Sequence, residues 1–325
     1  MKAFEYANPT TLKDAVNLLS EDWGETSILA GGTDLLALMK DELETPARLV
    51  DIKGIAELGG IKHSSDGLLL GATATMEELA TEDGVARRYR ALHDAAVGIM
   101  GPQILNRGTI GGDLCQRPRC WFYRLGYGLL GMENGKSLVP GGDNRYHAIL
   151  GNEGPAYFVS PSSLGPALIA MGAEIGILGP DGIRNLSIGD FFVTPGSESE
   201  RENALQSNEI VAEVRVPNVP ATNATYEIRQ KLQLDFPMVA ASVVLDIVDG
   251  TVGSARVVLG HVAPTPWRSE AAEQAITGQP VSEETAAAAG DAAAAGANPM
   301  SRNGYKVQLT RVAVKRAILA AARGQ

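Results

Sequence analysis

Two glycine pairs have the residue types and setting of an anion-binding loop. Gly31-Gly32 and Gly111-Gly112 each follow an apolar residue and precede a small polar or acidic one. Paired glycines let consecutive backbone N–H groups approach one oxyanion, because no Cβ is in the way. A helix predicted directly behind the first pair adds the positive end of its dipole. The pattern predicts a diphosphate held between two loops, with two ordinary tight turns as the alternative.

Two other patterns contain suitable residue types in the wrong setting. A literal G-x-G-x-x-G spans 126–131, but the glycines and prolines that follow prevent the helix that a dinucleotide fingerprint needs. We interpret that match as chance. Cys115 and Cys120 are the only cysteines, whereas a zinc or iron–sulfur site needs four ligands. With His147 as the one nearby helper, we interpret both as buried or inert thiols.

The segment 115–155 is rich in glycine, arginine and aromatic residues and has no clear period. We expect a long inserted loop there, of a length that usually has a function. Aromatic residues beside arginines fit docking to a partner protein or a ring cofactor, and local packing of the loop is the alternative. The residues concerned are Trp121, Phe122, Tyr123, Tyr127, Arg117, Arg119 and Arg124.

Length and charge restrict the class of protein. The 325 residues are enough for two or three domains of ~100–200 residues each. The formal net charge of −10, with no basic run, argues against a nucleic-acid or anionic-membrane binder. No apolar stretch approaches the ~18 residues of a membrane span, and the first residues form no apolar signal core. We therefore expect a cytoplasmic protein.

Hydrophobic periodicity and capping signals predict helices and strands in alternation. The Ala-rich run at 283–295 is expected to form a helix pair or one kinked helix, because Ala is the best helix former. The other expected helices are 11–20, one opening at 33–34, one from 75, 92–99, 164–171, 269–277 and 306–323. The expected strands are 26–30, 48–52, 68–72, 156–159, 174–178, 208–216, 239–248 and 255–261, with a linker at 217–223.

In order and spacing, the two loops and several later landmarks resemble the flavin-binding (medium) subunit of the molybdenum hydroxylases. This family includes xanthine dehydrogenase, carbon monoxide dehydrogenase and 4-hydroxybenzoyl-CoA reductase. The resemblance covers nearly the whole chain, although each motif alone is modest. The matches are Ile28 to Leu35, Thr109 to Asp113, Ser160 to Leu164 with Pro166-Ala167-Leu168, Asp190-Phe191-Phe192, Asn208 to Val211, Asp235-Phe236-Pro237, Pro264 to Arg268 and Asn303 to Lys306.

The resemblance implies an α+β fold. Two FAD-binding subdomains, of the kind shared with vanillyl-alcohol-oxidase-like (PCMH-like) flavoproteins, precede a C-terminal α+β domain with a small antiparallel sheet and helices. The expected boundaries are 1–56, 57–218 with the insertion at about 115–155, and 222–325.

FAD is the cofactor that the resemblance implies, held between the subdomains with both glycine pairs on its diphosphate. The family's contacts, carried over position by position, are made largely by the backbone. They fall on Ile28, Leu29, Ala30, Gly31, Gly32, Thr33, Asp34, Leu35, Ile99, Thr109, Ile110, Gly111, Gly112, Asp113, Ser163, Val211 and Lys231.

Three departures from the family pattern are visible. Ser163 stands where the family often has Asp, and Lys231 is the nearest match to a basic residue found after the linker. The insertion resembles a branch in which four cysteines bind an extra [4Fe–4S] cluster. This chain has two cysteines, and no thiol near Leu129, Ser137 or Ala156. We therefore expect the insertion without the cluster, and no metal in this chain.

The function implied by the resemblance is electron relay by an FAD-dependent oxidoreductase subunit in a heterotrimer. A molybdopterin-binding large subunit with the molybdenum cofactor would hydroxylate the substrate. A small subunit with two [2Fe–2S] clusters would pass electrons to FAD here, and FAD would hand them to NAD, a quinone or oxygen. No catalytic acid or base is expected on this chain. A stand-alone flavin oxidoreductase and a scaffold subunit that has lost flavin are the alternatives.

Overall fold

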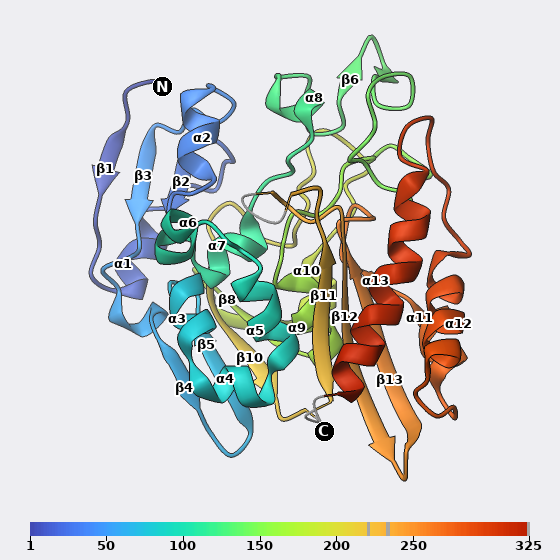
Figure 1. Ribbon diagram of the computed structural model, residues 1–325. Helices are drawn as coiled ribbons and strands as arrows, with labels where there is room; N and C mark the ends of the chain where they lie inside the picture. Colours follow the sequence, from blue (N-terminus) through green and yellow to red (C-terminus); the bar gives the residue numbers. More distant parts are fainter. Residues whose placement is uncertain (220–221, 232–234, 324–325) are drawn as a thin grey trace.

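Three larger sheets with helices packed on them, and one small hairpin, make up the described part of the chain in the computed structural model (Figure 1). The structure describes residues 1–219, 222–231 and 235–323. One sheet is parallel and two are antiparallel, so the expected α+β class is confirmed. No helix in this described part of the chain is both long and apolar enough to cross a bilayer.

The N-terminal sheet is parallel, with the strand order β1-β3-β2. Parallel neighbours need a crossover, and two short helices supply it. The hydroxyl of Thr11 accepts a hydrogen bond from the N–H of Asp14 and so caps the first of them. The elements are β1 (Glu5–Ala7), α1 (Leu12–Asn17), β2 (Thr26–Leu29), α2 (Leu35–Lys40) and β3 (Arg48–Asp51), followed by a 3₁₀ turn at Ala56–Leu58.

The second sheet is antiparallel, with the strand order β4-β5-β10-β8-β9. Leu70, Ile175 and Val214 on one face are fully buried against helices, and β10 alternates such buried residues with the less buried Glu213 and Arg215. Its strands are β4 (Ile61–His63), β5 (Gly67–Gly71), β8 (Glu174–Gly179), β9 (Gly182–Ser187) and β10 (Ile210–Pro217). Its helices are α3 (Met76–Thr81), α4 (Asp83–Arg88), α5 (Arg90–Val97), α6 (Pro102–Arg107), α7 (Ile110–Cys115), α9 (Gly165–Met171) and α10 (Ile188–Phe191).

The third sheet, β11-β12-β13-β14, is antiparallel and forms the C-terminal part of the molecule (Figure 1). The last helix packs on one face, while α5 and α9 pack on the other. The last two helices approach closely at Gly290, where a Cβ would lie 2.4 Å from the carbonyl oxygen of Arg311. The elements are β11 (Asn223–Ile228), β12 (Val239–Val248), β13 (Thr251–Gly260), β14 (Trp267–Arg268), α11 (Glu270–Ile276), α12 (Glu283–Ala294) and α13 (Tyr305–Ala322).

The insertion contains α8 (Trp121–Arg124) and a small hairpin of β6 (Met132–Glu133) and β7 (Lys136–Ser137) at the top of Figure 1. It is not a loose loop, because its side chains pack with α2 and with the segment after the insertion in one apolar cluster. The buried members of that cluster are Leu38, Tyr123, Leu129, Leu130, Ala156 and Phe158.

Most of the expected elements are present within a few residues, and the Ala-rich run forms one helix, α12. The strand expected at 156–159 is wrong, because this segment pairs with loops: Tyr157 accepts from the N–H of Ala148, and Ser160 donates to Ala263. The expected linker 217–223 is shorter than predicted, since β10 includes Pro217 and β11 begins at Asn223. Residues 220–221 of that linker lie outside the described residues.

Candidate functional site

The first glycine pair lies in the short loop between β2 and α2. The backbone N–H groups of Gly31, Gly32, Thr33 and Asp34 have no acceptor anywhere in the described part of the chain. All four lie just before the first turn of α2. Consecutive free donors in front of a helix form a binding site for an anion.

This loop presses against the backbone that leads to the second glycine pair. A Cβ at residue 31 would lie 1.7 Å from the carbonyl oxygen of Arg107, so only glycine allows the approach. Gly32 has φ +73°, a left-handed conformation that a side chain would strain. The two glycines therefore have separate roles: Gly31 allows two backbone segments to come close, and Gly32 lets the chain turn into α2.

The second glycine pair does not offer the free backbone donors that its sequence predicts. Residues 110–115 form α7, and the capping hydroxyl of Thr109 accepts from the N–H of Gly112 at 3.1 Å. The N–H groups of Ile110 and Gly111 donate to carbonyl oxygens in the turn after β5, at 2.9 and 2.8 Å. The backbone donors for an anion thus come from the first loop, while the second adds the Thr109 hydroxyl.

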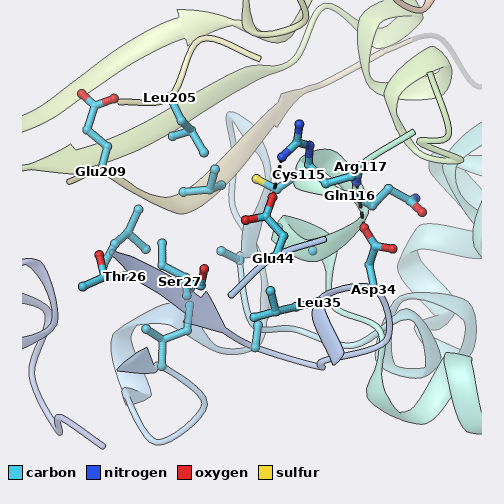
Figure 2. Close-up of a pocket in the computed structure, with 18 of the residues that line it drawn as sticks. Thr26, Ser27, Asp34, Leu35, Glu44, Cys115, Gln116, Arg117, Leu205 and Glu209 are labelled. Atoms are coloured by element: carbon cyan, nitrogen blue, oxygen red, sulfur yellow. Dashed lines mark hydrogen bonds and ion pairs between the residues drawn. The ribbon is translucent and has the colours of Figure 1, made fainter. Parts of the chain in front are cut away.

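Two chambers open on either side of these loops. The first has a volume of about 220 Å³ and lies between β2, α2 and the segment 205–211 (Figure 2). The second, of about 280 Å³, lies between α6, α7 and the segment that includes Asp235 and Phe236. Five residues line both chambers, so the loops form the waist of one elongated site: Thr33, Asp34, Thr109, Gly112 and Gln116.

Most of the residues expected to contact the cofactor line one of these chambers. Ile99 lies in the second chamber and Val211 in the first, so a molecule that touches both must pass the waist. Leu29 lines neither chamber. Ile110, the first residue of α7, also lines neither, because its side chain is fully buried in the core. The other expected residues in the first chamber are Ile28, Ala30, Gly31, Gly32, Thr33, Asp34, Leu35, Thr109, Gly111 and Gly112, and Asp113 and Ser163 line the second.

Of the two basic residues that follow β11, Arg229 lines the second chamber and Lys231 does not. Lys231 is exposed and lines neither chamber. Arg229 directly follows β11 and donates to the carbonyl oxygen of Asp235 at 3.0 Å, which holds its side chain over the chamber. It also pairs with Glu227, whose pKa burial raises to about 7 against the effect of this arginine. The sequence showed two basic residues here, and only the geometry distinguishes them.

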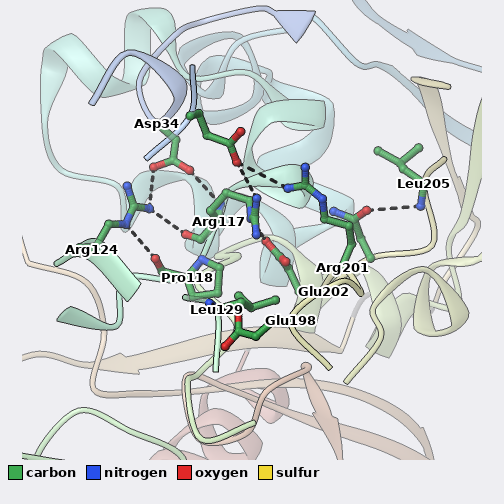
Figure 3. Close-up of polar contacts among 11 residues, drawn as sticks. Asp34, Arg117, Pro118, Arg124, Leu129, Glu198, Arg201, Glu202 and Leu205 are labelled. Carbon is green, nitrogen blue, oxygen red and sulfur yellow. Dashed lines mark hydrogen bonds and ion pairs between the residues drawn. The ribbon is translucent and has the colours of Figure 1, made fainter. Parts of the chain in front are cut away.

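Three arginines from the insertion contact the carboxylate of Asp34, and Figure 3 shows two of them, Arg117 and Arg124. This carboxylate accepts from the backbone N–H of Arg117 at 2.8 Å and from the guanidinium of Arg124 at 2.9 Å, and it pairs with Arg119 at 3.1 Å. Arg117 in turn pairs with Glu44 at 2.7 Å and with Glu202. A negative side chain beside an anion site is thereby neutralised, and the insertion is fixed to the first loop.

Asp113 ties the second loop to the segment that precedes α9. One carboxylate oxygen accepts from the hydroxyl of Ser162 at 2.6 Å and the N–H of Leu164 at 3.0 Å. The other accepts from the N–H of Ser163 at 3.1 Å and the side chain of Gln116 at 2.9 Å. Burial raises the pKa of Asp113, and these four donors oppose that shift. Asp113 is therefore a support of the second chamber as well as part of its wall.

Both cysteines are free thiols in enclosed positions. Burial raises the pKa of Cys115 to about 12 and also raises that of Cys120. Cys120 packs against the apolar cluster of Leu129 and Ala156, and its sulfur lies 3.1 Å from Nε2 of His147. Within the described ranges, no three His, Cys, Asp or Glu side chains are grouped to hold a metal ion. The absence of an iron–sulfur cluster stays a prediction.

Sequence reasoning missed Gln116, Arg119, Arg229 and Phe236, all of which line the second chamber. Arg119 had a signal, since it belongs to the arginine and aromatic cluster of the insertion. Phe236 had a signal too, since it belongs to the family landmark Asp235-Phe236-Pro237. The arrangement as a whole suits a ligand with two ring-bearing ends and an anionic centre.

Two family models match the chain in succession. The FAD binding domain in molybdopterin dehydrogenase matches residues 2–219, and the CO dehydrogenase flavoprotein C-terminal domain matches residues 224–321.

Curated relatives match over nearly full length. The aldehyde oxidoreductase FAD-binding subunit PaoB of Escherichia coli is 32% identical and is covered completely, as is this chain. The carbon monoxide dehydrogenase medium chain of Hydrogenophaga pseudoflava is 30% identical, with 98% of this chain and 96% of that one covered.

Solved structures agree with these matches. Carbon monoxide dehydrogenase of Hydrogenophaga pseudoflava contains a chain that is 31% identical, with a TM-score of 0.77 and coverage of 99% of this chain and 98% of that one. A chain of quinoline 2-oxidoreductase from Pseudomonas putida also has a TM-score of 0.77, at 26% identity, with 100% and 99% covered.

Proposed function

Because the chain belongs to the family of FAD-binding subunits of the molybdopterin dehydrogenases, we propose that it relays electrons inside a heterotrimeric oxidoreductase. The observation that carries this proposal is the waist between the two chambers. Four free backbone donors meet there, between two cavities of ring-accommodating size. FAD has the matching form, since a diphosphate joins its two ring systems.

The residues at the waist have defined tasks in this proposal. The N–H groups of residues 31–34 and the hydroxyl of Thr109 hold the diphosphate. The adenosine end occupies the first chamber, whose apolar wall includes Ile28 and Val211. The isoalloxazine ring occupies the second chamber, where Arg119 and Arg229 supply positive charge.

When bound, FAD accepts electrons one at a time and delivers two, and the protein tunes it by position and charge. Arg119 and Arg229 favour the negative charge that accompanies reduction of the ring. Ile99, Ile104 and Phe236 line the same chamber and restrict water around the ring. No side chain of this chain needs to exchange a proton with an organic substrate.

The partners belong to the proposal as well. We assign the substrate chemistry to a molybdopterin-binding large subunit and the supply of electrons to a small [2Fe–2S] subunit. The acceptor is an external molecule, and the complex is cytoplasmic. Within the chain, we assign residues 1–56 and 57–218 to the two FAD-binding subdomains and residues 222–325 to the C-terminal domain. Residues 324–325 lie outside the described part.

Two alternatives fit the second chamber less well. A stand-alone flavin oxidoreductase needs an acid or base beside the ring. Both carboxylate oxygens of Asp34 and of Asp113 already accept bonds, so Asp235 is the remaining carboxylate among the described lining residues. A scaffold that has lost flavin would have no use for four free donors or for a glycine at residue 31.

FAD titration of the purified chain tests the proposal. Gly31→Ala forces apart two backbones that a Cβ would place at 1.7 Å, so we expect at least a tenfold loss of FAD affinity. Gly141→Ala is the matched control, because that glycine has open space at its Cβ and an ordinary φ. Equal affinity of the wild type and Gly31→Ala, measured by flavin absorbance near 450 nm, contradicts the proposal.

A further inference from the structure

A third chamber, also of about 280 Å³, shares a wall with the second. Arg119, Asp235, Phe236 and Pro237 line both cavities. A molecule in the third chamber is therefore separated by single side chains from the place assigned to the isoalloxazine ring. The proposed function leaves this third chamber without a role.

Aromatic side chains form much of the wall of this chamber. Trp121 and Tyr146 meet edge to face, with ring centres 5.6 Å apart, and both come from the insertion. The guanidinium of Arg119 lies over the ring of Phe236, 5.0 Å from the ring centre. The indole N–H of Trp121 has no acceptor in the described part of the chain. Such walls suit a planar ring that bears hydrogen-bond acceptors.

Two basic side chains and one carboxylate line the chamber. Lys306 is held in place by the carbonyl oxygens of Tyr146, His147 and His261, at 3.0, 3.2 and 2.8 Å, and burial lowers its pKa to about 7. Arg119, which also pairs with Asp34, is the second basic group, while Asp235 is the single carboxylate among the described lining residues. This balance favours a neutral ligand whose oxygen atoms gain negative charge on reduction.

Two histidines in the wall lack partners for one ring nitrogen each. They are Nδ1 of His147 and Nε2 of His261, which find no hydrogen-bond partner among the described residues. Burial lowers the pKa of His147 to about 4 and that of His261 to about 3, so both rings are neutral. Buried polar atoms usually have a partner, and a ligand oxygen in this chamber can become one.

Cys120 contacts the other ring nitrogen of His147. Burial raises the pKa of this thiol, so it stays protonated, and its sulfur lies 3.1 Å from Nε2 of His147. In the tautomer in which the thiol donates to Nε2, the ring proton is on Nδ1. Nδ1 then offers a donor without a partner among the described residues, the group that a carbonyl oxygen needs.

The volume of the third chamber restricts the class of ligand. This volume equals that of the second chamber, which holds only the ring half of FAD in the proposed function. A nicotinamide dinucleotide is comparable with the whole of FAD and would need two such cavities. A one-ring or two-ring carbonyl compound fits within one.

We propose that the third chamber binds the head group of a quinone, the external electron acceptor of the proposed function on which this inference rests. The quinone gains two electrons and two protons from the two-electron-reduced FAD and leaves as the hydroquinone. Trp121 and Tyr146 contact its ring, while Arg119 and His147 lie beside its carbonyl oxygens. The insertion thus completes a site next to the flavin.

Calorimetric titration with duroquinone tests the site directly, on the full chain and without turnover. Its ring is fully substituted, so it cannot add to the thiol of Cys120. Trp121→Ala removes one wall, and Val159→Trp fills the cavity from another side. Tyr127→Ala is the matched control, an exposed aromatic of the same insertion that lines none of the three chambers.

We expect duroquinone to bind the wild type and Tyr127→Ala with equal affinity. Its affinity for Trp121→Ala should be at least fivefold lower, and it should not bind Val159→Trp. FAD content, measured on the same samples, should be equal in all four. A flavin-loaded wild type that does not bind duroquinone overturns the inference, as does unchanged binding by Val159→Trp. Binding of NAD⁺ that Val159→Trp abolishes also overturns it. A chain that binds duroquinone but no FAD refutes the proposed function and leaves the quinone site supported.

Discussion

Asp113 is the residue on which the shape of the second chamber depends most. Its two oxygens accept four hydrogen bonds, two of them from the backbone N–H groups of Ser163 and Leu164. Its side chain is almost fully buried, so water cannot replace it. Asp113→Ala leaves these backbone donors without partners, at about 1–3 kcal/mol for each. We expect the free energy of unfolding to fall by about 3–5 kcal/mol.

Urea denaturation of the purified chain measures this loss. With a slope of about 3 kcal/mol per molar urea, the midpoint should fall by more than about 1 M. Asp22→Ala is the matched control, because Asp22 is exposed and its carboxylate accepts no hydrogen bond from the described residues. Asp113→Ala with the same midpoint as Asp22→Ala would refute the assignment of Asp113 as a support of the chamber.

Three further predictions concern buried charges and rings. His261→Asn should reduce the acid sensitivity of folding. Burial lowers the pKa of His261 to about 3, so the folded state loses stability as the pH falls below the unfolded pKa of about 6.5. The loss reaches about 1.4 kcal/mol at pH 5.5. The wild type should lose that much more than the variant between pH 7.5 and 5.5 in urea titrations, and equal losses would contradict this. Lys306→Met breaks three hydrogen bonds to carbonyl oxygens and should lower the free energy of unfolding by about 2–4 kcal/mol. Lys315→Met on the same helix should lower it by less than about 1 kcal/mol. Urea denaturation measures both, and equal losses would show that the buried ammonium contributes nothing. Arg117→Met should destabilise more than the double variant with Glu202→Gln, because the single change leaves a buried carboxylate unpaired; additive effects in the double-mutant cycle would argue against this.

Local patterns were enough to predict much of this fold. The capping Thr75 with Glu78 marks the start of α3, and the apolar spacing within 306–323 marks α13, because both signals act within a few turns of one helix. The first glycine loop was predictable for the same reason. Its free donors depend only on the turn from β2 into α2.

Contacts outside the local pattern explain where the structure differs from these expectations. The donors of Ile110 and Gly111 are used by carbonyl oxygens near residues 72–74, a pairing that no local pattern encodes. Arg229 and Lys231 are both basic residues after the same strand, and only a contact with Asp235 brings one of them to the chamber. The segment 156–159 has strand-like residues, but its neighbours are loops. In each case the deciding partner lies outside the local run of residues that carries the prediction, even where, as with Asp235 and Arg229, it is only six residues away.

Anaerobic native purification, with flavin and metal analysis of every chain that co-elutes, tests the electron relay most directly. The account predicts one FAD in this chain, a molybdenum-containing large subunit, and a small subunit that brings the complex to about four irons, the content of two [2Fe–2S] clusters. About eight irons would mean that the insertion binds a cluster after all. A flavoprotein that elutes alone and turns over an organic substrate would contradict the relay.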